Sequence, residues 1–217
     1  MSRSVPPDPG FVDLAFPLAG GRLPRDHSLA LWDALARALP WLEHDERVAV
    51  FPIRAASVSD GSLAVNRHSR LMIRLPEARV RDALALCGTA LDVHGARLEI
   101  GRALTRALIA HGTLYAHRVA CAAADESVFV REVAAGLATL AIGGDFICGR
   151  RTATAGPDGT LVGFSLMLTG LKPAESLRLQ IAGLGPHRRL GFGLFIPHRS
   201  TAAVGSDRAA EEQHAFR

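Results

Sequence analysis

A segment near the C-terminal end of the chain combines residue types that suit phosphate. Residues 183–193, called the glycine loop below, hold four glycines, a histidine and two adjacent arginines. They are Gly183, Gly185, His187, Arg188, Arg189, Gly191 and Gly193. Glycine allows positive φ and a close approach of backbone N–H groups to an anion, and the arginine fork matches phosphate oxygens. The pattern predicts a phosphate cradle before the hydrophobic strand at 194–196, or else a flexible hairpin.

A second group of candidate residues precedes the first expected helix. His27 lies at the start of that helix, and Arg22 and Arg25 come just before it. An imidazole exchanges protons near neutral pH, and the two arginines could hold a phosphate beside it. The simpler interpretation is an exposed histidine with solvated arginines. His68, in the basic segment 66–70, is the second candidate for proton transfer.

The charge balance also favours a phosphate-rich partner. The net charge is +4, and nearly all of the basic residues are arginine because Lys172 is the only lysine. Arginine suits RNA phosphates, although a GC-rich genome produces the same bias. Arg150 and Arg151, at the start of an expected hairpin, are candidates for RNA backbone contacts or for solvated strand residues.

Several function classes are disfavoured by what the sequence lacks. The three cysteines are far apart and form neither a zinc pattern nor a secreted disulfide scaffold. There is no Walker A motif and no carboxylate cluster for a two-metal nuclease, so neither a metal nor a cofactor is expected. With no signal peptide and no long apolar run, the chain is expected to be cytoplasmic, without membrane partners.

Hydrophobic periodicity and turn signals predict an α+β fold of two ferredoxin-like halves in tandem, each with the order βαββαβ. The first half is expected at 11–103 and the second at 104–199, between disordered ends at 1–10 and 200–217. In the first half we expect strands at 11–19, 48–53, 71–75 and 93–100, and helices at 27–39, capped by Asp26, and 77–91. In the second half we expect an extended segment at 108–122 with a break at Gly112, strands at 146–155, 160–168 and 193–197, and helices at 125–142 and 173–182.

A duplicated ferredoxin-like chain that ends in a glycine loop and a short strand resembles the RAMP superfamily of CRISPR-associated proteins. Within it, the chain is similar to the endoribonucleases that cut CRISPR repeat transcripts into guide RNAs. The resemblance is carried by Val-Asp-Leu-Ala-Phe-Pro-Leu at 12–18, by Leu-Pro-Arg-Asp-His at 23–27, and by the glycine loop with the residues after it, as far as His198.

The resemblance implies metal-independent RNA cleavage, in which a ribose 2′-OH attacks the adjacent phosphate and leaves a 2′,3′-cyclic phosphate. It implies a histidine near the first helix as general acid or base, and His27 occupies that position. The implied partners are the repeat RNA hairpin and the processed guide RNA, without direct DNA contact. Membership of a CRISPR effector complex stays open.

Two other functions stay open from the sequence. One is a non-catalytic subunit that binds repeat RNA. The other is a two-histidine phosphoesterase, because His111-Gly-Thr-Leu and His198-Arg-Ser-Thr both have the pattern His-x-Thr/Ser-x. That enzyme class places both motifs on facing central strands, whereas the second motif here follows the last expected strand.

Overall fold

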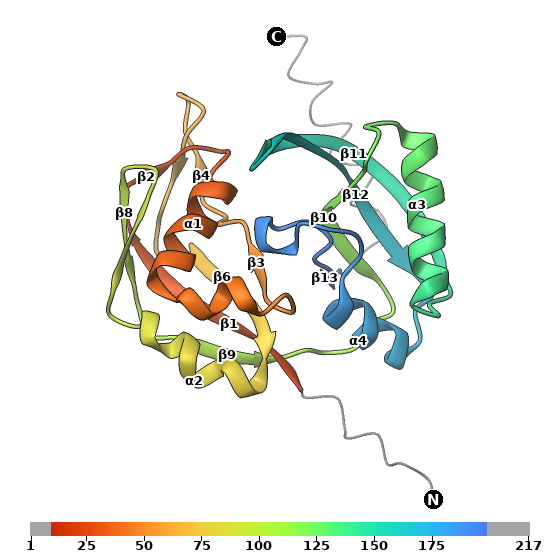
Figure 1. The fold of residues 1–217 in the computed structure, drawn as a ribbon, viewed down its shortest axis with the longest axis horizontal. Helices are drawn as coiled ribbons and strands as arrows, with labels where there is room; N and C mark the ends of the chain where they lie inside the picture. Colours follow the sequence, from red (N-terminus) through yellow and green to blue (C-terminus); the bar gives the residue numbers. More distant parts are fainter. Residues whose placement is uncertain (1–9, 199–217) are drawn as a thin grey trace, which may run out of the picture. The chain divides into compact units, whose positions relative to one another are not determined.

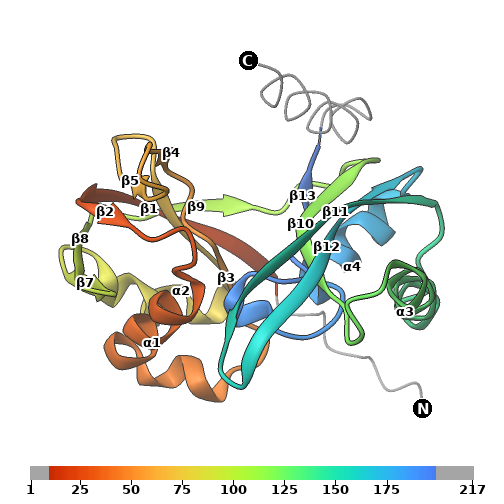
Figure 2. The same cartoon turned by 90° about the horizontal axis from the view of Figure 1, so that it is seen from above.

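The computed structural model describes residues 10–198, and its contacts divide the chain into two compact units, Met1–Leu108 and Ile109–Arg217. The expected disordered ends at 1–10 and 200–217 lie outside the described residues, apart from Gly10. The division falls after Leu108 and not after residue 103, because the strand at 104–107 pairs with the first strand of unit 1. Figures 1 and 2 show the elements of each unit in two views.

Unit 1 is built around one long central strand, β1 (Phe11–Gly20), in an antiparallel sheet of order β3-β6-β1-β8-β7, with β9 also paired to β1. The other strands of this sheet are β3 (Ala49–Phe51), β6 (Arg70–Pro76), β7 (Ala90–Val93), β8 (Ala96–Ile100) and β9 (Leu104–Ala107). The helical segments are α1 (Ser28–Ala38), η1 (Pro40–His44), η2 (Glu77–Arg79), α2 (Val80–Ala83) and η3 (Leu84–Leu86). A small second sheet joins β2 (Arg22–Leu23), β5 (Leu63–Ala64) and β4 (Ala56–Ser57).

The core of unit 1 lies between one face of the large sheet and these helices. Leu14 and Phe16 of β1 and Leu31 and Leu35 of α1 are all at most 1% exposed and belong to one hydrophobic cluster. Leu31 and Leu35 are four residues apart, so they lie on one face of the helix, as the sequence periodicity predicts.

Three details of unit 1 differ from the sequence prediction. The N-cap of α1 is His27 and not Asp26, and no side chain caps this helix. The expected helix at 77–91 is a short succession of η2, α2 and η3, which ends before Gly88 at φ 77°. The Gly88 N–H donates to Ile100 O, so the chain turns back toward the sheet early. The small sheet was not predicted, because two-residue strands are too short to show alternation.

Unit 2 repeats the order with fewer strands. It contains β10 (Leu114–Ala120), α3 (Glu126–Thr139), β11 (Asp145–Gly156), β12 (Gly159–Thr169), α4 (Pro173–Ala182), η4 (Arg188–Leu190) and β13 (Ile196–Pro197). The sheet order is β11-β12-β10-β13, so the third strand β12 lies between the second strand β11 and the first strand β10, and the fourth strand β13 pairs with the other edge of β10. Unit 1 follows the same order around β1, so the prediction of tandem ferredoxin-like halves is confirmed.

In the sheet of unit 2, both neighbours of β12 carry a β-bulge opposite the same residue, Ser165. The register of β12 with β11 shifts between Cys148 and Arg151, and its register with β10 shifts between Ala116 and Val119. In both cases two residues lie opposite Ser165 of β12. Bulges increase the local twist and bend the strands, and the long β11–β12 hairpin curves in Figure 2.

The helices of unit 2 form as their sequence signals predict. Asp125 caps α3, because its side chain accepts a hydrogen bond from the Val128 N–H, and α4 starts with Pro173 at its first position. Phe129 of α3 and Leu179 of α4 are fully buried in one cluster with Leu166 of β12. Both helices therefore pack on the same face of the sheet.

A buried carboxylate, Asp45, ties together two helical segments of unit 1. Its oxygens accept from Arg47 Nε at 2.9 Å and Nη2 at 2.8 Å, and from Arg79 Nε of η2 at 3.5 Å. Hydrogen bonds from Arg47 lower the pKa of Asp45 from 3.8 to about 2. Because the pKa is lower in the folded state, ionised Asp45 stabilises the fold at pH values above its unfolded-state pKa. This contribution is lost as the pH falls through about 2.

We predict that Asp45→Asn lowers the free energy of unfolding by about 1–2 kcal/mol at neutral pH, a range that allows for solvent screening of the half-exposed Arg47. The difference from the parent protein should shrink between pH 4 and pH 2, where the parent Asp45 becomes protonated. Urea unfolding at a series of pH values measures this. Asp33→Asn, on the exposed face of α1, is the control. A constant difference across this range would contradict the assignment.

Candidate nucleic-acid interface

The backbone of the glycine loop is largely engaged within unit 2. Gly183 N–H donates to Leu179 O at 2.8 Å, and Gly193 N–H donates to Arg118 O at 2.8 Å. Gly191 N–H donates to Arg188 O at 3.1 Å. These three amides are already hydrogen-bonded, so they do not form the predicted phosphate cradle.

The glycines at the two ends of the loop allow the backbone to close it. Gly183 and Gly193 adopt φ values of 69° and 65°, which side chains rarely adopt. A Cβ on Gly183 would also lie 2.8 Å from Gly193 O. These features give Gly183, Gly191 and Gly193 a role in closing the loop, and their contact with RNA stays a prediction. Gly185 is exposed and stays a candidate.

Arg118 of β10 holds the loop in place, and the sequence analysis missed it. Its Nη2 donates to Leu190 O at 2.7 Å, its Nε donates to Gly191 O at 3.4 Å, and its guanidinium lies 4.8 Å from the centroid of the Phe192 ring. No local pattern marks this arginine, because its partners are more than seventy residues away in the sequence.

The two arginines of the loop differ in their surroundings. Arg188 Nη1 donates to Ala182 O at 2.6 Å, at the C-terminal end of α4, where a cation also complements the helix dipole. This contact gives Arg188 a structural role, and its phosphate contact stays a prediction. Arg189 is half-buried, and His187 is exposed in the left-handed conformation at φ 66°.

The hairpin arginines lie where the sheet bends. Arg150 and Arg151 are both exposed on β11, the edge strand, at the bulge opposite Ser165. Because directly paired residues share a face of a sheet, Arg151 lies on the same face as its partner Phe164. The position suits the predicted contacts with an RNA backbone.

The arginines before α1 are exposed but already contact unit 1. Arg22 Nη1 lies 2.7 Å from Asp60 Oδ2 in an ion pair, and Arg25 Nη2 donates to Ser57 Oγ at 3.3 Å. Both contacts reach the small β2-β5-β4 sheet and its turn. The carboxylate of Asp60 offsets the charge of Arg22, so Arg25 is the better candidate for a phosphate contact.

His27 is not the exposed helix-terminal residue that the sequence suggests. It is 2% exposed, its Nδ1 lies 2.9 Å from Pro24 O, and its Nε2 accepts a hydrogen bond from the Ile53 N–H at 3.0 Å. An Nε2 that accepts carries no proton, so Nδ1–H donates to the carbonyl. The imidazole thus joins the segment before α1 to the chain after β3, and this geometry favours a positioning role over proton transfer.

His68 has the exposure that His27 lacks. It lies in a turn where its own N–H donates to Asn66 Oδ1 at 2.8 Å, and its Nε2 accepts from Arg67 Nε at 3.1 Å. Arg70 Nη1 donates to Arg67 O at 2.7 Å, which brings a second guanidinium into the same turn. An exposed imidazole that contacts one guanidinium, with a second in the same turn, is a candidate for proton transfer at a phosphate.

Neither His111 nor His198, the first residues of the two His-x-Thr/Ser-x motifs, lies in a strand. His111 precedes β10, and its Nδ1 lies 2.9 Å from Thr113 O in its own turn. His198 N–H donates to the same carbonyl at 3.1 Å, but residues 199–201 of its motif lie outside the described residues. This arrangement does not favour the phosphoesterase interpretation.

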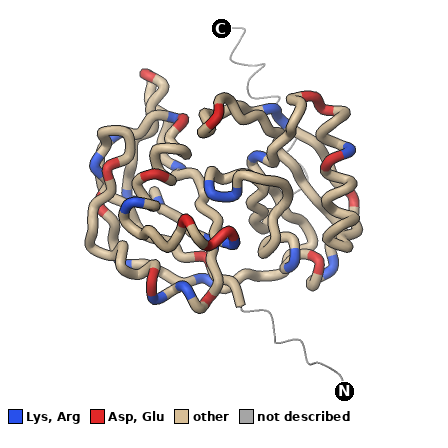
Figure 3. Tube along the Cα trace, in the orientation of Figure 1, with Lys and Arg blue, Asp and Glu red and all other residues tan. Residues whose placement is uncertain are grey.

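Acidic and basic residues are interspersed along the described part of each unit. Figure 3 shows blue and red segments interleaved along both units. Within residues 10–198, no group of three or more His, Cys, Asp or Glu residues is placed to hold a metal ion. In the same part of the chain, no helix is long and apolar enough to span a membrane.

Solved structures share the fold of this chain. A structure described as "CRISPR associated protein Cas6" aligns with a TM-score of 0.62 and 10% identity, covering 88% of this chain and 99% of that one. Another, described as "An RAMP protein binding different RNA substrates", aligns with a TM-score of 0.62 and 9% identity, covering 87% and 100%. At these identities the similarity shows a shared fold and no more.

Sequence comparison identifies the family. The Cas6 family, described as "Cas6 Crispr", matches residues 12–200. The "CRISPR-associated endonuclease Cas6" of Myxococcus xanthus (strain DK1622) is 36% identical over 197 residues, which is 90% of this chain and 85% of that protein. The chain belongs to the Cas6 family, as its resemblance to the RAMP endoribonucleases predicts.

We predict that Arg150→Ala combined with Arg151→Ala weakens RNA binding and reduces the slope of log affinity against log salt by up to about two, because each exposed arginine would neutralise one phosphate. Binding to labelled repeat RNA across a salt series measures this. Arg188→Ala should leave the slope unchanged but lower the melting temperature, because it removes a contact to the end of α4. A reduced salt slope with an unchanged melting temperature in Arg188→Ala would instead indicate that Arg188 contacts the RNA.

Proposed function

We propose that this protein is an endoribonuclease that cuts CRISPR repeat transcripts into guide RNAs, by internal attack and without a metal ion. The observation that carries the proposal is the family match along nearly the whole described chain, together with a 36% identical relative described as a CRISPR-associated endonuclease. The substrate is the repeat RNA hairpin, and the processed guide RNA is the product.

The reaction needs three kinds of group. A general base takes the proton of a ribose 2′-OH, and the 2′-oxygen attacks the adjacent phosphorus. The bond from phosphorus to the 5′-oxygen breaks, a general acid protonates that oxygen, and the products are a 2′,3′-cyclic phosphate and a 5′-OH. Cations stabilise the additional negative charge in the transition state.

The turn that contains His68 offers one group for proton transfer together with two cations. His68 is exposed, and Arg67 and Arg70 lie in the same turn. We assign the proton transfer to His68 and the stabilisation of charge to the two arginines. His27 acts as a positioning residue, because its bonds to Pro24 O and Ile53 N–H fix the segment that carries Arg25.

Further exposed or half-exposed residues would bind the RNA backbone. They are Arg25, Arg150, Arg151, Gly185, His187 and Arg189. Their roles are contacts with phosphate or ribose, so substitutions there should change affinity more than the rate of cleavage from bound RNA.

We predict that purified protein cleaves repeat RNA in excess chelator, and that one 2′-deoxy substitution before the cut abolishes cleavage while binding is retained. Internal attack requires the 2′-oxygen as nucleophile, whereas a metal-activated water does not. Gel analysis of labelled RNA, with a test for the cyclic phosphate end, measures both. Loss of cleavage in chelator, or efficient cleavage of the deoxy substrate, would contradict the mechanism.

We predict that His68→Ala lowers the single-turnover cleavage rate about 100-fold or more, with the melting temperature and RNA affinity nearly unchanged. His27→Ala should lower the melting temperature, since it leaves the buried Ile53 N–H without its acceptor. His27→Gln, which can accept from Ile53 but cannot transfer a proton, should restore most of the activity.

His44→Ala is the control, because His44 is exposed at the end of η1 and no role is assigned to it. A His27→Gln protein of normal melting temperature that cleaves as slowly as His27→Ala would make His27 the proton-transfer residue. Full activity of His68→Ala would remove the 66–70 turn from the active site.

A further inference from the structure

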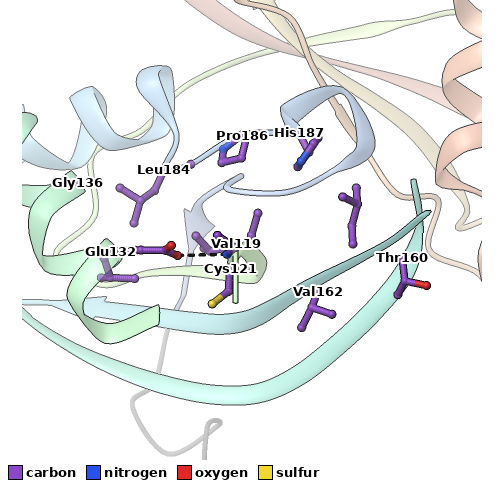
Figure 4. A pocket seen from close by; sticks show the side chains of 14 residues that line it. Val119, Cys121, Glu132, Gly136, Thr160, Val162, Leu184, Pro186 and His187 are labelled. Carbon is purple, nitrogen blue, oxygen red and sulfur yellow. Dashed lines mark hydrogen bonds between the residues drawn. The ribbon is translucent and has the colours of Figure 1, made fainter. Parts of the chain in front are cut away.

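A pocket of about 420 Å³ lies within unit 2, between the glycine loop, α3 and the ends of β10 and β12. Figure 4 shows Glu132 of α3 on one side, Pro186 and His187 of the loop above, and Val162 and Thr160 of β12 on the opposite wall. This volume lies within the range of about 300–1,000 Å³ that is typical of pockets for small ligands.

The pocket owes its shape to close packing at its inner end. Leu184 lies against Gly136 of α3, where a Cβ would be only 2.6 Å from Leu184 Cδ1. Val119, Val133 and Leu184 are buried and form apolar walls. The Cys121 thiol is used internally, because its Sγ donates to Asp125 O at 3.5 Å.

Glu132 is the one acidic residue among those lining the pocket. Its Oε2 accepts from Ala122 N–H at 3.5 Å, a long contact that leaves most of the carboxylate's acceptor sites available to a ligand. Such a group would repel a phosphate but would accept hydrogen bonds from a ligand with N–H donors. Apolar walls with one acceptor pair match a flat heterocycle that carries donors on one edge.

Among the RNA bases, guanine fits this requirement best. Its N1–H and N2–H₂ groups form two adjacent donors, which a carboxylate can accept together, whereas the other bases offer no such donor pair. RNA-binding proteins take up unpaired bases by stacking on aromatic or histidine side chains and by bonding to their Watson–Crick edges. The exposed His187 ring at the rim can supply the stacking surface.

The strand beside the pocket supplies a cation at a suitable place. Val162 lines the pocket and pairs with Ala153, and Phe164 pairs with Arg151, so Arg151 lies on the same sheet face, diagonally next to Val162. Arg151 is exposed on the edge strand. A nucleotide with its base in the pocket could therefore place its phosphate near Arg151, with the opposite charges of Glu132 and Arg151 setting its orientation.

We propose that this pocket binds one unpaired guanine base of the substrate RNA, with Glu132 accepting from its N1–H and N2–H₂ and with Arg151 at the adjoining phosphate. The proposal rests on the proposed function, since it gives the RNA-cutting protein a base-specific subsite in unit 2. It adds sequence recognition to contacts that otherwise involve only the RNA backbone.

The test compares short labelled oligouridines that are identical except for one central nucleotide. We expect the oligomer with a central guanosine to bind about 10-fold or more tightly than the all-uridine oligomer, and inosine, which lacks the N2 amine, to lose most of that advantage. Glu132→Gln should remove the guanosine advantage and leave the affinity for oligouridine unchanged. Arg151→Ala should weaken binding of all the oligomers equally.

Val162→Phe, which fills the pocket, should also abolish the preference, and Val130→Phe on the exposed face of α3 is its matched control. Melting temperatures identify any variant that fails to fold. If Val162→Phe fails to fold, Glu132→Gln still tests the proposal. Equal affinities for the guanosine and uridine oligomers, or an undiminished preference in Glu132→Gln, would overturn the proposal. Tighter binding of free 5′-GMP than of the guanosine oligomer would make this a nucleotide site and overturn the assignment to RNA.

The outcome for the proposed function is read separately, by cleavage of repeat RNA with the parent protein. Cleavage without a guanosine preference overturns the base pocket alone. A guanosine preference that depends on Glu132, in a protein that does not cleave repeat RNA, supports the pocket and overturns the proposed function.

Discussion

The conformation of the glycine loop depends on one side chain, Arg118 of β10. Its guanidinium donates to the carbonyls of Leu190 and Gly191 and stacks on Phe192, and its own carbonyl accepts from Gly193 N–H. Leaving such partly buried carbonyls without a donor costs about 1–3 kcal/mol for each group. Arg118 thereby keeps Pro186 and His187 at the rim of the pocket, although it does not line the pocket itself.

Arginines that are chemically the same have different roles according to their surroundings. Arg188 binds a carbonyl at the end of α4, and Arg22 pairs with Asp60, so part of the basic charge is already used within the protein. Arg74 is 1% exposed and holds Asp13 through two hydrogen bonds at 2.7 and 2.9 Å. Composition alone therefore overstates how much basic surface is available to RNA, and exposed residues such as Arg151 matter more than the net charge.

The two histidines of unit 1 show how burial separates structural from chemical roles. Both belong to basic segments, and both could transfer protons. His27 fits between a carbonyl and an amide, which fixes its tautomer and removes it from solvent. His68 lies in an exposed turn among guanidinium groups, where a phosphate could approach it. The assignment of chemistry to His68 follows from access to its ring.

The sequence by itself determined the elements with strong local signals and, through its resemblance to a known family, the class of protein. The amphipathic helix α1, the helix that starts at Asp125, the β11–β12 hairpin and the helix after Pro173 all form as predicted, because periodicity and turn residues act over a few neighbouring positions. Only the tertiary structure decided which candidate residues are accessible. The contacts from Arg118 to Leu190, from Arg74 to Asp13 and from His27 to Ile53 join residues 72, 61 and 26 positions apart. Such pairings depend on how strands and loops are brought together, and a local sequence pattern carries no record of them.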